Sequence, residues 1–396
     1  MNKVGIVGLG YVGLPTAVFA AESGYLVCGF DTNEEKVKQI KACVSYIEDI
    51  ESVRVRNVVV NKLLSAHNQV EGLNNSDIIV ICVPTPISQS RKPDLTYLLE
   101  ATSGVAKVLK AGTLVIIEST VEPGTIRNII VPILEKESNL ARDKFMVAYS
   151  PERIDPGNKK WNLGNVPKLI SGMNQESIDS AKTFYAKFVN ELIECPSFEV
   201  AETAKLLENS FRYINISFVN ELSMFCKNLG INIMDVVNAA STKPYGFMPF
   251  YPGIGVGGHC IPVDPLYLAN KAREIGAPTE FIDLADRINQ KMPGYFVERA
   301  EERLGGLSEK KILVVGVAYK PNISDVRETS AKALITGLRS KGADVYWHDD
   351  LVKKWDGENS VPLSNSYDLA ILATPHDYLD LSKLGLVPLL NTKSSI

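Results

Sequence analysis

The sequence lacks several features that would place it in other classes of protein. No apolar run approaches the roughly 18 residues that a membrane-spanning helix needs, so we expect no membrane anchor. The first apolar stretch, VGIVGLG, is too short and too rich in glycine for a secretory signal, which favours a cytoplasmic location. Basic residues are not in excess, with 42 Lys and Arg against 46 Asp and Glu, so we expect no nucleic-acid partner.

The six cysteines show no C-x-x-C spacing. This absence argues against both a zinc site and a disulfide scaffold, and we expect no bound metal. A net charge of −4 still permits an anionic small-molecule ligand, because such a site needs only a few local cations.

The composition that is present is that of an ordinary globular protein. The chain has 396 residues, of which 45% are hydrophobic and 22% are charged. At roughly 150 residues per domain, this length favours two to three domains. Short apolar runs alternate with helical stretches from residue 3 to residue 150, a pattern typical of βαβ units and a parallel sheet.

Two further patterns divide the chain. Residues 199–229 contain no Pro or Gly and carry apolar residues at helical spacing, which predicts a long helix suited to an oligomer interface. From residue 310 a strand–turn–helix pattern returns, and KKILVVGVAYK resembles KVGIVGLGYVG. We therefore predict an α/β protein with two Rossmann-like doubly wound domains, 1–198 and 306–396, joined by a central helical domain, 199–305.

A glycine fingerprint lies between the first predicted strand and helix. Gly8, Gly10 and Gly13 form G-x-G-x-x-G, which gives a tight turn, close approach to a pyrophosphate and close helix packing. Asp31 ends the second predicted strand, where a carboxylate accepts hydrogen bonds from ribose hydroxyls and repels a 2′-phosphate. The cofactor is therefore predicted to be NAD rather than NADP.

The loops after the third and fourth predicted strands, VPTP at 83–86 and ESTVEPGT at 118–125, should line the nicotinamide side of this cofactor. The expected cofactor-binding residues are Gly8, Gly10, Tyr11, Val12, Gly13, Asp31, Lys36, Pro84, Thr85, Thr120 and Glu122.

A second glycine-rich loop, GIGVGGHCIPVDP at 253–265, carries Cys260. Its backbone N–H groups suit a phosphate, and a thiol among backbone dipoles ionises more readily to the nucleophilic thiolate. NAD with a nucleophilic cysteine suggests two successive oxidations, from alcohol to aldehyde and, through a thiohemiacetal and a thioester, to acid. The other five cysteines are expected to be packing residues.

Seven ordered motifs make the chain resemble the UDP-glucose/GDP-mannose dehydrogenase family nearly from end to end. They are GLGYVGLP at 8–15, VPTP at 83–86, EST at 118–120, SPER at 150–153, AETAKLLENSFRYINISFVNEL at 201–222, GVGGHCIPVDP at 255–265 and GVAYKPNISDVRE at 316–328. The resemblance implies a four-electron oxidation at C6 of a nucleotide sugar, with NAD in the first lobe, UDP in the second and a dimer built on the central helices.

The resemblance also implies roles for individual residues. Cys260 matches the thioester-forming cysteine, and Lys205 and Asn209 match the pair that holds the reacting end of the substrate. Asp264 and Glu152 match residues that position water or take a proton. The expected catalytic residues are Cys260, Lys205, Asn209, Asp264, Glu152 and Thr120. The expected substrate-binding residues are Glu152, Arg153, Lys205, Asn209, Tyr251, Gly255, Gly257, Gly258, His259, Lys320 and Arg327.

The motif around the cysteine bears on the sugar. UDP-glucose dehydrogenases tend to have an aromatic residue before the cysteine, whereas this chain has His259 in YPGIGVGGHC. The chain is most similar to the branch that acts on UDP-N-acetylhexosamines, with UDP-GlcNAc favoured and UDP-ManNAc the other candidate. A homodimer or higher homo-oligomer is expected.

Three other functions remain as alternatives. One is a UDP-glucose 6-dehydrogenase. Another is a two-electron hydroxyacid or 6-phosphogluconate type of dehydrogenase, which needs no nucleophilic cysteine. The last is a redox-sensing NAD-binding regulator, which needs a DNA-reading module that the sequence does not show.

Overall fold

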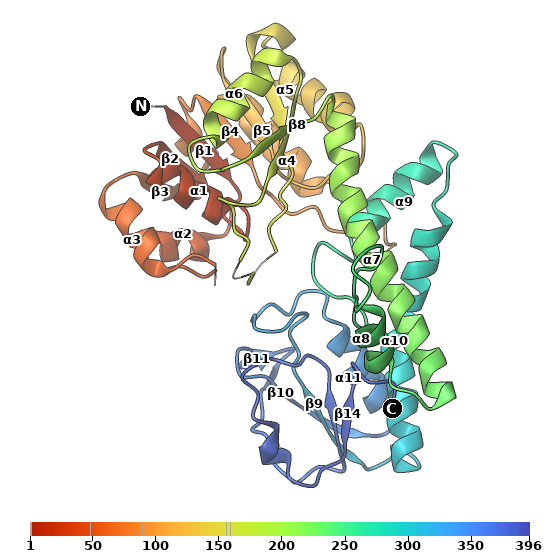
Figure 1. Ribbon diagram of the computed structural model, residues 1–396. Helices are drawn as coiled ribbons and strands as arrows, with labels where there is room; N and C mark the ends of the chain where they lie inside the picture. Colours follow the sequence, from red (N-terminus) through yellow and green to blue (C-terminus); the bar gives the residue numbers. More distant parts are fainter. Residues whose placement is uncertain (1, 48, 89, 156, 159) are drawn as a thin grey trace. The chain divides into compact units, whose positions relative to one another are not determined.

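The computed structural model describes residues 2–47, 49–88, 90–155, 157–158 and 160–396. It divides into two compact units, residues 1–207 and 208–396, and the division falls within a 32-residue helix, α7 (Phe198–Leu229) (Figure 1). This helix coincides with the long helix predicted at 199–229 and confirms it. The boundaries of the three predicted domains stay a prediction.

The first unit is built on one sheet with the strand order β3-β2-β1-β4-β5-β6-β7-β8. Its strands are β1 (Lys3–Val7), β2 (Leu26–Phe30), β3 (Leu64–His67), β4 (Ile78–Ile81), β5 (Leu114–Ile117), β6 (Met146–Tyr149), β7 (Lys168–Gly172) and β8 (Leu192–Glu194). Its helices are α1 (Gly13–Glu22), α2 (Glu34–Lys41), α3 (Ser52–Val60), α4 (Thr96–Val108), α5 (Val131–Ser138) and α6 (Gln175–Tyr185).

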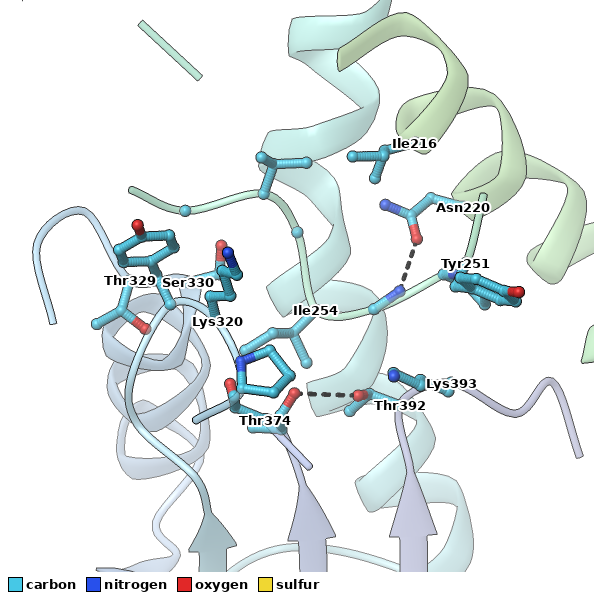
Figure 2. A pocket seen from close by; sticks show the side chains of 18 of the residues that line it. Ile216, Asn220, Tyr251, Ile254, Lys320, Thr329, Ser330, Thr374, Thr392 and Lys393 are labelled. Atoms are coloured by element: carbon cyan, nitrogen blue, oxygen red, sulfur yellow. Dashed lines mark hydrogen bonds between the residues drawn. The ribbon is translucent and has the colours of Figure 1, made fainter. Parts of the chain in front are cut away.

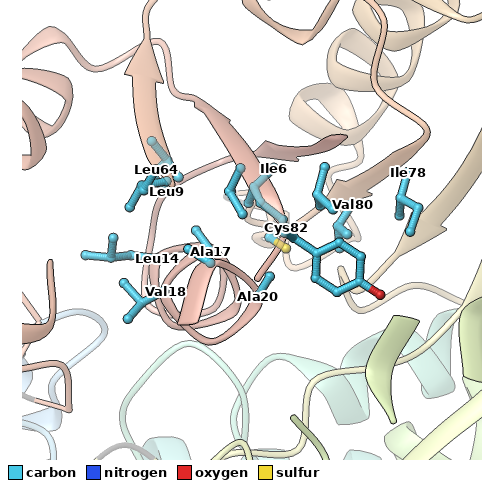
Figure 3. Close-up of a cluster of buried hydrophobic side chains, with 14 of the residues drawn as sticks. Ile6, Leu9, Leu14, Ala17, Val18, Ala20, Leu64, Ile78, Val80 and Cys82 are labelled. Carbon is cyan, nitrogen blue, oxygen red and sulfur yellow. The ribbon is translucent and has the colours of Figure 1, made fainter. Parts of the chain in front are cut away.

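Both faces of this sheet are buried. In β5 the side chains of Leu114 and Ile116 join one apolar cluster, while Val115 and Ile117 join the other. Successive strand residues point to opposite faces, so a strand covered on both sides must be apolar throughout. Helices α1, α2, α3 and α6 supply the first cluster, part of which Figure 3 shows, and α4 and α5 supply the second.

The sheet is parallel as predicted except at one pair, β6 and β7, which run antiparallel. Between the two strands the described residues form a long connection without a helix. A parallel return needs a crossover, usually a helix, and this connection provides none. The sequence analysis did not anticipate β3, β7 or β8.

The start of α7 is tied to the loop after β5 by a buried carboxylate. Glu202 accepts hydrogen bonds from the amides of Gly124 at 2.6 Å and Ile126 at 3.0 Å. Burial raises the pKa of Glu202 to about 7, although the two amides lower it. One turn earlier the half-buried Glu199 pairs with Arg127, whose hydrogen bond holds the pKa of Glu199 at about 2.

Glu202 makes the stability of the first unit dependent on pH. Between its ordinary pKa of 4.5 and about 7, the folded chain keeps a proton that the unfolded chain has lost. The free energy of unfolding should therefore fall by up to about 3 kcal/mol as the pH rises through this window. Glu202→Gln should remove this slope in denaturant unfolding at pH 5 and pH 8.

Glu199→Gln is the matched control, because the depressed pKa of Glu199 makes the free energy of unfolding rise with pH rather than fall. Its contribution is present above the ordinary pKa of 4.5 and is lost as the pH falls towards 2. The Glu199→Gln variant should therefore keep the wild-type change in the free energy of unfolding between pH 5 and pH 8. If E202Q kept the wild-type pH dependence of the unfolding free energy, Glu202 would not be its cause.

The second unit contains a four-stranded parallel sheet with the order β10-β9-β13-β14. This order repeats β2-β1-β4-β5 of the first unit, which confirms the internal repeat. The strands are β9 (Lys311–Val315), β10 (Asp344–His348), β13 (Leu369–Leu372) and β14 (Leu389–Asn391), with a small hairpin of β11 (Lys354–Trp355) and β12 (Glu358–Asn359).

The helices wholly within this unit are α8 (Ile233–Ala240), α9 (Asp264–Glu274), α10 (Glu280–Leu304) and α11 (Ser330–Ser340). Residues of α10 and α11 pack on one face of the four-stranded sheet, around Trp347 and Phe296. The predicted fold class is confirmed: two Rossmann-like sheets with a helical segment between them in the sequence. Among the described residues, no helix is long and apolar enough to cross a membrane.

Candidate functional site

The predicted cofactor residues of the first unit gather at one edge of its sheet. Strands β1, β4, β5 and β6 are neighbours and parallel, so their carboxyl ends lie side by side. The glycine turn follows β1, Pro84 and Thr85 follow β4, Thr120 and Glu122 follow β5, and Glu152 follows β6. The strand order reverses between β1 and β4, which is where open α/β sheets bind nucleotides.

The glycine turn has the geometry that a dinucleotide requires. Gly8 has φ of +87°, and a Cβ there would lie 2.8 Å from the carbonyl oxygen of Cys82. A Cβ on Gly13 would lie 1.8 Å from the carbonyl oxygen of Gly8. A Cβ on Gly10 would meet nothing within 4 Å, so this glycine leaves the open side of the turn clear. Tyr11 and Val12 lead into α1, whose N-terminus favours an anion.

Asp31 is held where the second strand ends. Its carboxylate accepts hydrogen bonds from the amide of Leu9 at 2.8 Å, from the amide of Asn33 at 2.8 Å and from Lys36 Nζ at 3.1 Å. A carboxylate has capacity for further donors, and ribose hydroxyls are such donors. These residues fit NAD. Tyr46 was not anticipated; its hydroxyl donates to the carbonyl of Leu9 at 2.5 Å.

Glu152 is the part-buried carboxylate after β6. Its Oε1 accepts hydrogen bonds from the amides of Arg153 at 2.6 Å and Ile154 at 2.7 Å. Its Oε2 lies 3.4 Å from Nζ of Lys168, a residue that the sequence analysis missed. The Arg153 guanidinium donates to the carbonyl of Pro167 at 2.6 Å.

Helix α7 carries the two predicted substrate-holding residues. Lys205 and Asn209 lie four residues apart on one helix face, and both are buried. Asn209 Nδ2 donates to Oδ2 of Asp264 at 2.6 Å, which joins two of the predicted catalytic residues directly. Asp264 is the first residue of α9 and is also buried.

Cys260 lies one turn before α9. The amide of Asp264 donates to the carbonyl of Cys260 at 2.8 Å, and the amide of Val263 donates to the same carbonyl at 3.1 Å. Of the six cysteines, Cys260 is the one with an exposed side chain; Cys43 is intermediate and the other four are buried.

The glycine-rich loop packs closely against the segment after β9. Cβ atoms on Gly257 and Gly258 would lie 2.7 Å from the carbonyl oxygen of Glu328 and 2.7 Å from the ring of Tyr319. The amide of Gly258 donates to the carbonyl of Arg327 at 3.2 Å. This close packing explains why glycine stands at these positions.

Two asparagines that the sequence analysis missed anchor the same loop. Asn220 on α7 accepts from the amide of Gly253 at 2.9 Å, which Figure 2 shows, and Asn289 on α10 accepts from the amide of Val256 at 2.6 Å. Nothing in the local sequence signals these contacts, because each joins residues 33 positions apart.

A pocket of about 260 Å³ lies within the second unit (Figure 2). It is bounded by the glycine-rich loop, by α7 and by the segments that follow β9, β13 and β14, which is the edge where such sheets bind ligands. Its cations are Arg212, Lys320 and Lys393, and its described lining includes no Asp or Glu. The chemistry of this lining suits a diphosphate.

Four predicted substrate residues, Tyr251, Gly255, Gly257 and Lys320, line this pocket, whereas Gly258, His259, Cys260 and Arg327 are outside its described lining. Arg327 instead forms an ion pair with Asp325, with 2.5 Å between Nη2 and Oδ2. Burial and the charge of Arg327 lower the pKa of His259. The sequence analysis missed Arg212, Asn220, Thr374 and Lys393, which also line the pocket.

The second unit has its own acid at the end of the strand that corresponds to β2. Asp349 is fully buried and accepts from the amide of Val317 at 2.9 Å and from His376 Nε2 at 3.0 Å. Burial raises the pKa of Asp349, but these hydrogen bonds lower it further, to about 2. Asp31 also accepts from an amide of its turn, so the difference in the second unit is His376, which donates to a carboxylate that is 0% exposed, against 8% for Asp31.

Comparison with known proteins agrees with this architecture. Residues 2–189 match the NAD binding domain of the UDP-glucose/GDP-mannose dehydrogenase family, residues 199–291 its central domain and residues 313–387 its UDP binding domain. A UDP-N-acetyl-D-glucosamine 6-dehydrogenase of Pseudomonas aeruginosa is 35% identical over 94% of this chain and 90% of that protein.

Two solved structures are also similar. A UDP-D-ManNAc dehydrogenase of Pyrococcus horikoshii has a TM-score of 0.91 and 33% identity, covering 100% of this chain and 96% of that one. A UDP-glucose dehydrogenase of Pyrobaculum islandicum has a TM-score of 0.90 and 28% identity, covering 99% and 94%. The chain therefore belongs to the UDP-glucose/GDP-mannose dehydrogenase family and is an NAD-dependent nucleotide-sugar dehydrogenase.

Proposed function

We propose that the protein oxidises the C6 hydroxyl of a UDP-N-acetylhexosamine to the carboxylic acid, with UDP-GlcNAc favoured over UDP-ManNAc. The observation that carries the four-electron chemistry is the arrangement of Cys260, Asp264 and Asn209 in the second unit. An exposed thiol lies one turn before a helix whose first residue, Asp264, is a buried carboxylate held by Asn209. A two-electron dehydrogenase has no use for this thiol.

The proposed steps begin with oxidation of the alcohol to an aldehyde, in which a C6 hydrogen leaves as a hydride and the hydroxyl proton leaves to water. The Cys260 thiolate then forms a C–S bond to the aldehyde carbon, and the oxygen becomes an oxyanion that Lys205 and Asn209 stabilise. A second oxidation gives a thioester. Water cleaves the C–S bond, gives a proton to Glu152 or Asp264, releases the acid and returns the thiolate. NAD, when bound, supplies the hydride acceptor for both oxidations.

The preference for an N-acetylhexosamine rests on the motif that contains His259 and on the relatives. The P. aeruginosa and P. horikoshii proteins carry names for UDP-GlcNAc and UDP-ManNAc. UDP-glucose is the alternative substrate, since the P. islandicum structure carries that name with a TM-score of 0.90.

A substrate panel tests this function. Purified protein with NAD is given UDP-GlcNAc, UDP-ManNAc, UDP-GalNAc or UDP-glucose, and NADH and sugar acid are measured. We expect turnover with UDP-GlcNAc and two NADH for each acid formed. Robust turnover with UDP-glucose alone would overturn the sugar assignment, and one NADH per substrate would overturn the four-electron reaction.

We also propose that Lys320 and Lys393 bind the diphosphate of the substrate. Both line the pocket, and a hydrogen bond to a charged group contributes about 1.5–3 kcal/mol. Lys320→Met and Lys393→Met should each raise KM for the UDP-sugar by roughly tenfold to a hundredfold in initial-rate assays.

The matched control is Lys332→Met on α11, because Lys332 is an exposed lysine of the same unit paired with Asp356. It should leave KM unchanged. Unchanged KM in both pocket variants would show that the substrate phosphates bind elsewhere.

Finally, we propose that the protein is a homodimer whose subunits meet along α7. Of the apolar residues predicted on this helix, Leu206 is buried, but Phe211, Phe218 and Phe225 are 46%, 60% and 56% exposed. Their seven-residue spacing forms one stripe, as in helices that pair with a second helix. Phe218→Glu should convert a dimer to a monomer in sedimentation experiments, and a wild type that sediments as a monomer would contradict the proposal.

A further inference from the structure

We propose that Lys168 is a positioning residue for Glu152, shared between that carboxylate and a second, buried one, Glu118. The inference rests on the proposed role of Glu152 as the group that takes a proton from water. It adds Lys168, which lies in none of the quoted motifs, and gives a role to Glu118, the first residue of EST at 118–120; both lie wholly within the first unit.

The geometry places one ammonium between two carboxylates. Lys168 is the first residue of β7, which pairs antiparallel with β6, and Glu152 lies just beyond the end of β6. Lys168 Nζ lies 2.9 Å from Oε1 of Glu118 and 3.4 Å from Oε2 of Glu152. The side chains of Lys168 and Glu118 are 4% and 0% exposed, whereas Glu152 is 14% exposed.

Glu118 holds the inner end of this arrangement. Besides Lys168, it accepts from the Tyr185 hydroxyl at 2.6 Å and from Cys82 Sγ at 3.2 Å, and Thr16 Oγ1, which donates to the carbonyl of Val12 at 3.0 Å, lies 3.3 Å away. Three donors fit within the acceptor capacity of one carboxylate. Glu118 therefore competes with Glu152 for the Lys168 ammonium.

The titratable groups around Lys168 come from four elements. Cys82 follows β4, Glu118 follows β5, Glu152 follows β6 and Tyr185 ends α6. Burial lowers the pKa of Lys168, but the charges of Glu118 and Glu152 raise it further, so the ammonium keeps its proton. Burial and the charge of Glu118 raise the pKa of Cys82 and Tyr185, so both stay neutral.

Both oxygens of Glu152 therefore have fixed partners. Oε1 accepts from the amides of Arg153 and Ile154, and Oε2 faces Lys168, so the carboxylate is held in one orientation. A buried ion pair is weak evidence for stability, because the cost of removing both charges from water offsets the attraction. Its distinctive consequence is electrostatic: Lys168 places a positive charge 3.4 Å from Oε2 of Glu152, and Glu118 shares that charge at 2.9 Å.

The test compares Lys168→Met and Glu118→Gln by the pH dependence of kcat. Without the cation, the acid limb of the profile should move to higher pH by about one unit or more; without the second carboxylate, it should move to lower pH. The kcat of K168M should fall about tenfold or more, because a general base that is poorly placed loses part of its contribution. Lys168→Arg should restore most of this loss.

The matched control is Lys182→Met on α6, a lysine of the same unit that pairs with Glu194 at the surface. It should keep the kcat and the profile of the wild type. If K168M does not fold, the position of the acid limb in the E118Q variant tests the inference. A folded K168M or E118Q with an unmoved acid limb would overturn the inference, as would shifts in the same direction.

Glu152→Gln separates this inference from the proposed function. If E152Q loses acid formation but the limb stays in place in K168M and E118Q, the inference fails and the function stands. If E152Q forms acid at the rate of the wild type, the proposed role of Glu152 fails, and the inference fails with it.

Discussion

Cys260→Ser is expected to lower acid formation by roughly 10³-fold or more, since a serine hydroxyl ionises far less readily than a thiol and is a much weaker nucleophile. The variant should keep the fold, because Cys260 is exposed and contributes little packing. NADH release and the sugar products, followed together by absorbance and mass spectrometry, measure the effect. Any residual NADH should come with aldehyde rather than acid.

Cys43→Ser is the matched control. Cys43 is a partly exposed cysteine of the first unit to which no role is assigned, so acid formation should match that of the wild type. If C260S formed acid at the normal rate with two NADH per sugar, the thioester route would be wrong. The buried Cys82 is a poor control, because its thiol donates to Glu118.

Lys205→Met is expected to lower kcat by about 10²–10³-fold, the usual loss when a donor to a developing oxyanion is removed. Methionine preserves most of the length of the buried side chain but removes the charge. KM for the UDP-sugar should change much less, because the oxyanion exists only after the substrate has begun to react. Steady-state kinetics and single-turnover product formation measure the two effects.

Lys227→Met on the same helix is the control. Lys227 pairs with Glu302 at the surface of the second unit, and its loss should leave kcat unchanged. A K205M variant that keeps its kcat but raises KM would assign Lys205 to ground-state binding instead.

Much of the first unit was predictable from local sequence. A strand covered on both faces must be apolar at every position, so runs such as residues 78–81 and 114–117 are evident without a structure. Gly8 and Gly13 were equally evident from the G-x-G-x-x-G spacing. The structure gives the physical reason, because a Cβ at either position would meet backbone atoms. Asp31 was also predictable, because the glycine motif leads one to expect an acidic residue at the end of the second strand of the same βαβ unit, which spans about 30 residues.

The interactions that orient the site were not predictable in this way. The sequence analysis anticipated neither β7 nor a role for Lys168, and the antiparallel pairing of β6 and β7 places this lysine, buried, between two carboxylates. Asn220 and Asn289 read as ordinary polar residues of long helices, yet they hold the glycine-rich loop. Each of these contacts joins residues distant in sequence, so a local sequence pattern does not predict them.

The second unit has one feature that the sequence predicted and one that only the structure revealed. Its repeat of strand, turn and acid was evident in the sequence, because alternation of apolar strands with turns is a local property. The surroundings of Asp349 were decided by His376, which follows β13 in the sequence and donates to this carboxylate, whereas the turn amide that binds Asp349 has its counterpart at Asp31. The sequence by itself indicated the fold class, the long helix, most strands of the first sheet and the motif residues; only the tertiary structure decided which charges face one another, because burial and pairing depend on neighbours that the chain brings together in folding.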